Sequence, residues 1–314
     1  MTIKNLLPGV KKNILLKNYT TFKIGGPAKY FFVAKNKEDL IRAISVAKKI
    51  NPSPFPKGDR VKLPFFVLGG GSNLLVSDKG FNGILIKIRN TKYEIPACPA
   101  GRQNTKIMAE AGVMLGELVN ILAKTELSGL EWAAGIPGTV GGAIFGNAGA
   151  FNKSMKDVVK SVEALEVKNE KCKVKNFKNR DCKFSYRDSI FKNNKNLIIL
   201  SVTLQMKRGD KKEIENKIKK NLEQRNKTQP LNFPSGGSIF KNPPGFFAGE
   251  LVKRCGLKGK KVGNVKISEK HSNFIVNLGN GKAKDVIKLI KLIKQKVKKK
   301  FGVTLEEEIQ FLGF

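Results

Sequence analysis

The sequence predicts an α+β protein, and three observations support this fold class. Strand-like apolar runs are interspersed with segments whose apolar residues recur at helical spacing. Two glycine-rich stretches interrupt the N-terminal part, which indicates close backbone approaches rather than long regular elements. The composition changes after Pro230, so residues 231–314 are expected to form a separate α+β domain of ordinary size.

The length and the cysteine pattern set the class of protein. A chain of 314 residues suits two or three domains. It has no apolar run of about 18 residues and no secretory-signal pattern, so a cytoplasmic protein without a membrane span is expected. The cysteines are widely spaced and only one histidine is present, which predicts reduced structural thiols and no metal site. These residues are Cys98, Cys172, Cys182, Cys255 and His271.

The net charge of +35 would suit a nucleic-acid-binding protein, because basic side chains release counterions from a phosphate backbone. However, most of the basic residues are lysines spread along the whole chain, whereas arginine is expected for bidentate contacts. No alternation with aromatic residues is present either. We interpret the excess as a compositional bias and expect neither nucleic acid nor membrane as a partner, although the field should attract anionic small molecules.

The N-terminal elements follow from their apolar spacing. Residues 1–17 are expected to be an irregular or helical lead-in. The runs "KYFFVA", "LPFFVL" and "FNGILIKI" predict strands, and the second ends in the triple glycine of "LGGGSNLLV". Apolar residues at helical spacing predict helices over 37–50 and 113–127. The proline-rich residues 51–60 are expected to be a surface loop.

The middle of the chain begins with "GLEWAAGIPGTVGGAIFGNAGAF", residues 129–151. Its glycine content predicts loops and turns rather than a helix or a strand. Strands are then expected over 161–169, 172–177 and 196–207. A charged helix follows over 211–230 and is stopped by Pro230.

The C-terminal part predicts a short helix over 246–256 ended by glycine, and strands over 262–268 and 273–278. Residues 283–302 show an amphipathic helix whose lysine-rich face we interpret as solvated. The last twelve residues, "VTLEEEIQFLGF", predict a strand. In such a strand Glu306 and Glu308 would share one face and Glu307 the other, and by themselves they are typical of a solvated acidic patch.

Two glycine-rich stretches are candidates for ligand contact. In "LGGGSNLL" the glycines can turn backbone N–H groups toward an anion, and Ser72 and Asn73 add side-chain donors. A plain tight turn is an equal alternative. The second stretch, at 129–151, suggests two close approaches to one elongated polyanionic ligand, such as a flat cofactor with a diphosphate. Glycines that allow close packing of elements are the alternative explanation.

Two further segments offer polar side chains for catalysis. In "FSYRDSIFK", Arg187 stands among aromatic residues and could bind a carboxylate or phosphate, or could form a structural pair with Asp188. In "PSGGSIFKNPPG", Ser238 follows two glycines. The glycines let the backbone approach a ligand closely, and the serine hydroxyl could then supply a proton.

The motifs together resemble those of the UDP-N-acetylenolpyruvoylglucosamine reductase (MurB) family of peptidoglycan synthesis. The matching segments occur in family order over residues 18–313, and they are "NYTTFKIGGPA", "LGGGSNLLV", "GLEWAAGIPGTVGGAIFGNAGAF", "FSYRDSIFK", "GGSIFKNPPGFFAGELVKRCGLKG", "VGNVKISEKHSNFIVN" and "GVTLEEEIQFLG". The segment "PPGFFAGELV" and the short region after Arg187 resemble the second type of the family, which lacks an inserted tyrosine-bearing loop.

The resemblance implies a PCMH/vanillyl-alcohol-oxidase-type FAD-binding fold. Residues 18–230 would hold non-covalent FAD in two lobes, about 18–90 and 91–230, and residues 231–314 would form an α+β substrate-binding domain. It further implies NADPH as reductant, a UDP-sugar enolpyruvyl ether as the small-molecule substrate, UDP-N-acetylmuramate as product and a monomeric enzyme without metal. Another oxidase of the same fold is the alternative that the C-terminal motifs oppose, and a nucleic-acid-binding protein is the alternative from another class.

The resemblance also assigns residues. Ser238, Arg187 and Glu308 match the family's catalytic positions. The flavin would lie against Gly69, Gly70, Gly71, Ser72, Asn73, Gly135, Pro137, Gly138, Thr139, Gly142, Gly146, Asn147 and Gly149. Substrate contacts would come from Asn242, His271 and Tyr186.

The chemistry of the implied reaction suits these residue types. Hydride adds to C3 of a vinyl ether only if the negative charge at C2 can spread into the carboxylate. Arg187 could give that carboxylate two donors. Glu308 would act either as a protonated donor or by orienting Arg187, and proximity to an anion favours the protonated form. Ser238 would then supply the proton to C2.

Overall fold

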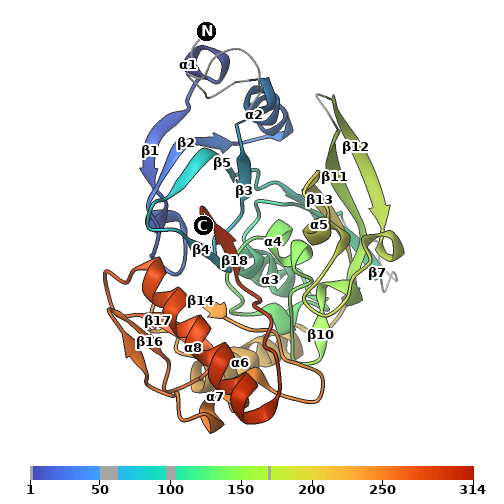
Figure 1. Ribbon diagram of the computed structural model, residues 1–314. Coiled ribbons are helices and arrows are strands. Elements are labelled where there is room, and N and C mark those ends of the chain that lie inside the picture. Colours follow the sequence, from blue (N-terminus) through green and yellow to red (C-terminus); the bar gives the residue numbers. More distant parts are fainter. Residues whose placement is uncertain (1–2, 50–62, 97–103, 169–170) are drawn as a thin grey trace, which may run out of the picture. The chain divides into compact units, whose positions relative to one another are not determined.

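The computed structural model describes residues 3–49, 63–96, 104–168 and 171–314 (Figure 1). The proline-rich segment 51–60 and Cys98 lie outside the described residues. The chain divides into two compact units that are each discontinuous in sequence. Unit 1 consists of Met1–Val10, Phe32–Gly70 and Ile84–Gln224, and unit 2 of Lys11–Phe31, Gly71–Gly83 and Arg225–Phe314.

Unit 1 contains an antiparallel sheet with the strand order β12-β11-β13-β7-β6, and β8 also pairs with β13. Its long strands confirm the three strands predicted between residues 161 and 207, because alternate side chains are buried along them. The strands are β6 (Tyr93–Glu94), β7 (Asn104–Glu110), β8 (Leu127–Ser128), β11 (Val159–Lys168), β12 (Lys171–Lys178) and β13 (Leu197–Arg208).

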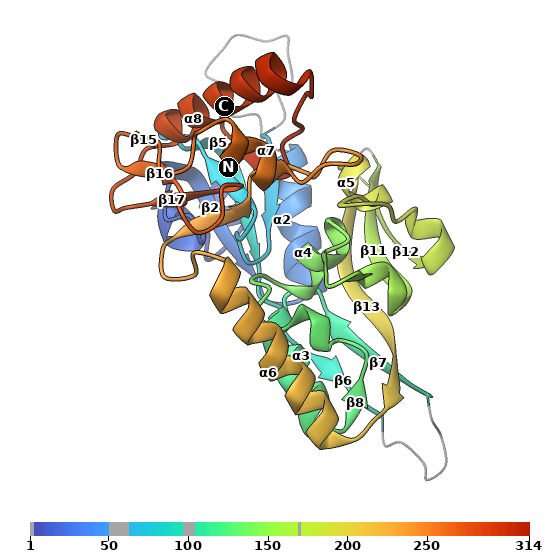
Figure 2. The ribbon, with the colours of Figure 1, turned by 90° about the horizontal axis from the view of Figure 1, so that it is seen from below.

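The other elements of unit 1 agree with the apolar spacing of the sequence. Strand β3 (Phe65–Leu68) pairs in parallel with β5 (Phe81–Ile88), whose first residues belong to unit 2. Helices α2 (Lys37–Lys49), α3 (Leu115–Lys124) and α6 (Lys211–Thr228) confirm the predicted helices. Figure 2 shows the length of α6, and Asn221 on this helix donates a hydrogen bond of 3.0 Å to the carbonyl of Glu131.

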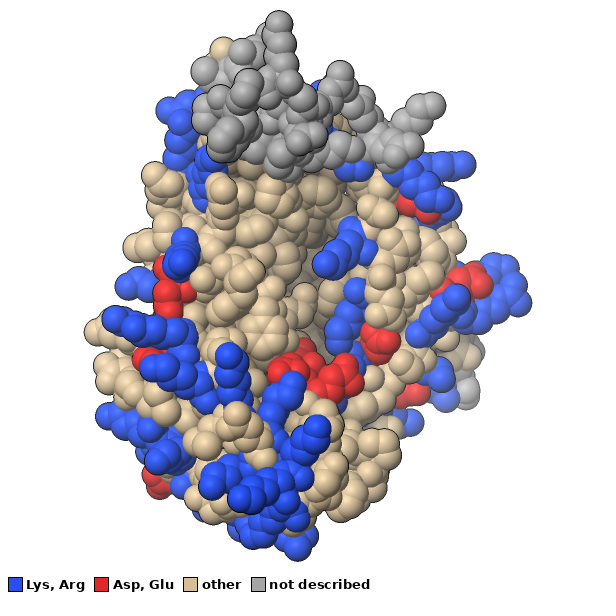
Figure 3. Space-filling model, viewed as in Figure 1, with Lys and Arg blue, Asp and Glu red and all other residues tan. Residues whose placement is uncertain are grey.

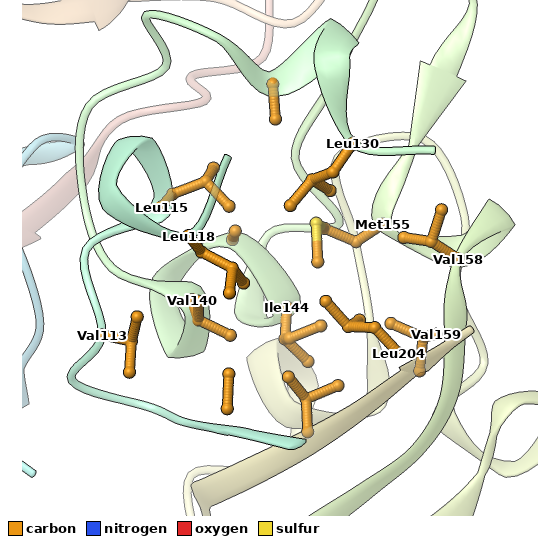
Figure 4. Close-up of a cluster of buried hydrophobic side chains, with 14 of the residues drawn as sticks. Val113, Leu115, Leu118, Leu130, Val140, Ile144, Met155, Val158, Val159 and Leu204 are labelled. Carbon is orange, nitrogen blue, oxygen red and sulfur yellow. The ribbon is translucent and has the colours of Figure 1, made fainter. Parts of the chain in front are cut away.

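The prediction that residues 129–151 form loops and turns is wrong at the short strand β9 (Gly149–Ala150) and at one helix. Residues Val140–Phe145 form helix α4, which begins at Thr139, whose hydroxyl accepts a hydrogen bond from the N–H of Gly142. Val140 and Ile144 on α4 point into the hydrophobic core (Figure 4). Core packing therefore outweighs the low helix propensity of the two glycines.

Several short elements complete unit 1. They are α1 (Ile3–Leu6), the 3₁₀ turns η2 (Glu131–Ala133), η3 (Met155–Asp157) and η4 (Asn179–Cys182), α5 (Ile190–Asn193), and the hairpin of β9 (Gly149–Ala150) and β10 (Lys153–Ser154). The core of the unit gathers side chains of the large sheet, α3 and α4, and Figure 4 shows Leu118 and Leu204 among them.

Unit 2 contains a small antiparallel sheet in the order β14-β17-β16-β15, as expected for the C-terminal region. The buried stripe of α8 contributes to the core of this unit, as the amphipathic pattern predicts. The elements are β14 (Ser235–Ser238), α7 (Ala248–Arg254), β15 (Lys261–Val262), β16 (Val265–Ile267), β17 (Phe274–Asn277) and α8 (Ala283–Phe301).

Segments from the N-terminal third complete unit 2. Strand β4 (Leu74–Val76) pairs in parallel with the last strand, β18 (Gln310–Leu312). Strand β1 (Lys11–Leu15) pairs with β2 (Pro27–Ala34) and is followed by the 3₁₀ turn η1 (Leu16–Tyr19). The sequence predicted neither β1 nor β4, since both are short and lack a clear period-two pattern.

The last strand is shorter than predicted. It begins at Gln310, so the three glutamates precede it, and Glu307 forms only an isolated bridge with Phe240. The alternation that would place Glu306 and Glu308 on one face of a strand therefore does not apply. Glu306 pairs instead with Lys241 at 2.6 Å and Glu307 with Lys294 of α8 at 2.8 Å.

Figure 3 shows that, on the face in view, many lysine and arginine side chains gather toward the lower end, with some acidic side chains among them. No helix in the described ranges is both long and apolar enough to span a bilayer.

Candidate functional site

The two glycine-rich stretches of unit 1 touch each other. A Cβ on Gly70 would lie 2.5 Å from the Cα of Gly138, and a Cβ on Gly69 would lie 2.6 Å from the hydroxyl of Thr139. Gly138 has a φ of +114°, which only glycine adopts readily. Close packing of two turns, which the sequence left as an alternative, is therefore one real function of these glycines.

The same turns leave backbone donors available for a ligand. Within the described part of the chain, the N–H groups of Gly70, Gly138 and Thr139 donate no hydrogen bond to the protein. Gly142 is exposed, and a Cβ there would meet only the Thr139 hydroxyl at 3.6 Å. Unpaired N–H groups grouped in glycine turns are a setting that binds anionic oxygens.

Lys87 of β5 adds a positive charge beside this turn, and the sequence analysis did not select it. Its ammonium group donates a hydrogen bond to the carbonyl of Gly69. Burial, followed by the charge of Arg89, lowers the pKa of Lys87 below its ordinary value. The signal for it was a single lysine inside the otherwise apolar run "GILIKI".

The end of the "GGGSN" turn belongs to unit 2. Gly71 has a φ of +66°, and a Cβ there would lie 2.1 Å from the carbonyl oxygen of Tyr19. The side chain of Asn73 donates a 3.0 Å hydrogen bond to the carbonyl of Glu308, and its own carbonyl accepts one from Gln310. The side chain of Asn73 is therefore used to hold the segment that carries the candidate catalytic glutamate.

Arg187 lies in unit 1 on a tight turn, at a φ of +56°. Its guanidinium donates a 2.9 Å hydrogen bond to the carbonyl of Gly149 and stacks over the half-exposed ring of Tyr186. A Cβ on Gly149 would lie 2.6 Å from the carbonyl oxygen of Lys153 and 3.2 Å from the guanidinium of Arg187, so the hairpin requires glycine there first of all.

Asn147 links the second glycine-rich stretch to this turn. Its side-chain amide donates to the carbonyl of Ser185 at 2.8 Å and accepts from the N–H of Lys156 at 3.0 Å. Three predicted site residues, Asn147, Gly149 and Arg187, are therefore brought together in unit 1.

Ser238 and Glu308 come together in unit 2. Ser238 is the last residue of β14, and the carbonyl of the next residue, Ile239, accepts a 2.8 Å hydrogen bond from the N–H of Glu308. Asn273 fixes the same stretch by accepting from the N–H of Phe240 and donating to its carbonyl. The backbone segments that carry Ser238 and Glu308 are thus hydrogen-bonded to each other.

The candidate substrate residues of unit 2 have structural partners. The side chain of Asn242 accepts a 3.0 Å hydrogen bond from the N–H of Ala248, at the start of α7. His271 accepts at Nδ1 from the N–H of Asn273, so its Nε2 carries the proton in the neutral ring. Burial lowers the pKa of His271, which favours this neutral form.

Other features lie outside these clusters. A pocket of about 450 Å³ in unit 2 is lined by residues of 226–233 and 266–270 together with Val276, and it includes none of the predicted site residues. Cys172, Cys182 and Cys255 are free thiols. Burial, followed by the charge of Asp181, raises the pKa of Cys182 to about 12, which makes it an inert structural thiol.

The class of protein, an FAD-binding oxidoreductase, follows from comparison with known families, and the contacting glycine turns and mixed sheets suit it. A family model for an FAD binding domain matches residues 28–174. A second model, for the C-terminal domain of UDP-N-acetylenolpyruvoylglucosamine reductase, matches residues 229–312.

Relatives over the full chain support the same assignment. The UDP-N-acetylenolpyruvoylglucosamine reductase of Caldanaerobacter subterraneus is 43% identical and covers 95% of this chain and 92% of its own length. That of Caldicellulosiruptor bescii is 41% identical and covers 100% and 94%. The crystal structure of the Thermus caldophilus reductase (MurB) superposes with a TM-score of 0.77 at 34% identity, over 96% of this chain and 98% of its own.

This chain belongs to the UDP-N-acetylenolpyruvoylglucosamine reductase family, the flavin-dependent reductases of peptidoglycan precursor synthesis. The resemblance seen in the sequence is thereby confirmed, as is the PCMH-type FAD-binding fold with an α+β C-terminal domain. The match over residues 229–312 also argues against another oxidase of the same fold.

Proposed function

We propose that this protein is a cytoplasmic, monomeric enzyme that reduces UDP-N-acetylglucosamine enolpyruvate to UDP-N-acetylmuramate with NADPH. The observation that carries the proposal is the backbone hydrogen bond from Glu308 to Ile239, which ties the segment of Ser238 to that of Glu308 within the region that matches the family's C-terminal domain. The names of the relatives support the choice of substrate.

The residues present fit FAD. Its diphosphate would be held by the unpaired N–H groups of Gly70, Gly138 and Thr139, with the charge of Lys87 beside them. The predicted contacts of Gly69–Asn73 and of residues 135–149 are part of this proposal. When bound, FAD would supply the hydride that NADPH delivers to the enzyme.

Arg187 is proposed to bind the enolpyruvyl carboxylate, and the carbonyl of Gly149 and the ring of Tyr186 hold its guanidinium in place. Charge that develops at C2 of the substrate spreads into this carboxylate. An electrostatic stabiliser of this kind contributes about 3–4 kcal/mol to the transition state. Glu308 would donate a proton to the same group or orient Arg187, while Asn242, His271 and Tyr186 would contact the substrate.

Ser238 is proposed to protonate C2 after hydride has added to C3. A serine hydroxyl is a weak acid in water, but it can protonate a strongly basic carbanion held at hydrogen-bond distance. Ile239 and Phe240, which follow it, are held on both sides by Glu308 and Asn273. This gives the hydroxyl a defined location.

The test is an absorbance spectrum of the purified protein, followed anaerobically by NADPH and then by the enolpyruvyl sugar nucleotide. We expect flavin bands that bleach with NADPH and return with the sugar. Ser238→Ala should bleach normally and regain its bands orders of magnitude more slowly, whereas Ser161→Ala, a serine on the large sheet of unit 1, should match the wild type.

Other outcomes would separate the parts of the proposal. Bands that bleach and never return in the wild type would contradict the substrate. Normal recovery in Ser238→Ala would remove this serine from the mechanism. A protein that shows no flavin bands even after FAD is added, and that binds DNA or RNA in a salt-sensitive way, would favour the nucleic-acid alternative.

A further inference from the structure

Thr21 is hydrogen-bonded both to the strand that carries Ser238, through its side chain, and to the end of the glycine turn, through its backbone. Its hydroxyl donates a 2.7 Å hydrogen bond to the carbonyl of Ser235, the first residue of β14. Its backbone N–H donates at 3.1 Å to the carbonyl of Gly71. A hydroxyl has one proton to donate, and the distance of 3.4 Å to the carbonyl of Ser72 makes Ser235 the better acceptor.

The sheet alone fixes β14 poorly. Its pairing with β17 includes Ser235 and Ser238 but is irregular between them, where Gly236 and Gly237 lie. Gly237 has a φ of +77° and no atom within 4 Å of a Cβ built on it. The two glycines give the backbone freedom between Ser235 and Ser238. Ser238 itself pairs with Phe274, so the course of the strand before it depends on what holds Ser235.

Apolar contacts restrain β14 on one of its faces and do not fix its position along that face. A Cβ on Gly236 would lie 2.7 Å from Ile309 and 3.1 Å from the ring of Phe22, the residue after Thr21. These contacts press on one face of the strand and have little directional preference. The hydrogen bond from Thr21 to Ser235 is directional and sets how far the strand shifts along that surface.

The candidate glutamate is attached to the same turn by a separate bond. Asn73, two residues after Gly71, donates to the carbonyl of Glu308 at 3.0 Å, and β4 pairs with β18 directly beyond. Thr21 therefore links Gly71 to the segment of Ser238 through its backbone and its side chain, and the side chain of Asn73 links the next part of the chain to the segment of Glu308.

We propose that Thr21 is a positioning residue for proton transfer, because it fixes the strand that carries Ser238 relative to the backbone of Gly71, which belongs to the same unit. This inference rests on the proposed function. Thr21 does not contact the substrate in this scheme, and it acts through Ser235. Its loss should slow protonation of the substrate and leave reduction of the enzyme by NADPH nearly unchanged.

The experiment compares Thr21→Val, which keeps the shape and removes the donor, with Thr21→Ser, which keeps the donor. In Thr21→Val we expect flavin reoxidation by the enolpyruvyl sugar to slow by at least about tenfold, because small displacements of reacting groups have effects of this size. Reduction by NADPH should change less than about twofold. Thr21→Ser should restore reoxidation, since it keeps the hydrogen bond.

Two further readouts separate positioning from general damage. The solvent deuterium isotope effect on reoxidation should rise in Thr21→Val, because proton transfer then limits the rate. Hydrogen exchange of the amides of residues 235–240 should also increase in the protein as purified. The matched control is Thr20→Val, which removes a neighbouring buried hydroxyl that reaches only the carbonyl of Ile24. This control should leave both readouts unchanged.

The outcomes distinguish this inference from the proposed function. A wild type that is never reoxidised by the sugar contradicts the proposed function itself. A wild type that turns over normally, with equal slowing of both half-reactions in Thr21→Val and Thr20→Val, overturns the role of Thr21. If Thr21→Val does not fold, Thr21→Cys provides the comparison, since a thiol is a weaker donor, and it must still raise the isotope effect.

Discussion

The glycine turn at 69–71 and the glycines of β14 use the same residue for different physical reasons. At Gly70 the backbone of Gly138 occupies the place of a side chain, so glycine is required for space. At Gly237 a Cβ would meet nothing within 4 Å, and the φ of +77° makes glycine a conformational requirement. Glycine at position 70 allows two segments to pack tightly against each other. Glycine at position 237 instead gives the backbone of β14 conformational freedom, which other hydrogen bonds then restrict.

The largest effect is expected from a substitution at Gly70, where the two glycine turns are in contact. In Gly70→Ala the new methyl group would meet the backbone of Gly138, which cannot rotate away, so the two turns must separate. We expect the free energy of unfolding to fall by about 3 kcal/mol or more, with loss of FAD binding. Urea unfolding and a flavin fluorescence titration measure the two effects.

A matched control for Gly70→Ala is Gly116→Ala in α3, where a Cβ meets nothing within 4 Å. It should raise the free energy of unfolding by about 0.5–1 kcal/mol, because alanine is the better helix former. A Gly70→Ala protein as stable as the wild type would show that the contact between the turns is not close-packed.

An intermediate effect is expected from a substitution at Gly237, which has space for a side chain but a left-handed backbone. Gly237→Ala should lower the free energy of unfolding by about 1–2 kcal/mol, the penalty of a left-handed conformation. Gly256→Ala, at a φ of +71° and equally unobstructed, should lower it by the same amount. Only Gly237→Ala should also slow flavin reoxidation, because Ser238 follows it. Equal kinetics in the two variants would mean that the backbone at 237 does not set the position of the serine.

The smallest effect on stability is expected at Gly142, and this substitution tests the assignment of the cofactor site. Gly142→Ala places a methyl group on α4 in ordinary van der Waals contact with the Thr139 hydroxyl, and it should stabilise the protein by about 0.5 kcal/mol. If the flavin lies against this exposed glycine, its affinity should nevertheless fall by about tenfold, or 1.4 kcal/mol. Fluorescence titration measures this affinity, with Gly116→Ala as the control. An unchanged flavin affinity in Gly142→Ala would show that the flavin does not contact α4 at this glycine.

Elements with a long regular apolar pattern could be predicted from the sequence. Elements whose local sequence is unfavourable and which are stabilised by packing or capping could not. The spacing predicted α8, α6 and the long strands of the large sheet, because each buries a regular face. It missed α4, since the burial of Val140 and Ile144 and the cap by Thr139 offset two helix-breaking glycines. It also placed the terminal glutamates in a strand, although two of them are drawn to lysines of neighbouring elements.

In the candidate site, too, some residues could be selected from the sequence and others only from the structure. Motif order selected Ser238, Arg187 and Glu308, and the structure joins Ser238 and Glu308 at Ile239 and sets Arg187 against Gly149. No local pattern could select Thr21, because its importance comes from a hydrogen bond to a residue 214 positions away. A lysine such as Lys87 is common in this chain, so its burial beside Gly69 gave only a faint sequence signal.

The sequence by itself determined the family, the fold class and the residue types of the chemistry, because these depend on motif identity and on local apolar periodicity. The tertiary structure decided which glycines are obstructed and which are open, which amide side chains hold the backbone, and which distant segments are bonded to β14. These properties depend on long-range contacts between segments hundreds of residues apart, and no local spacing of residues encodes such contacts.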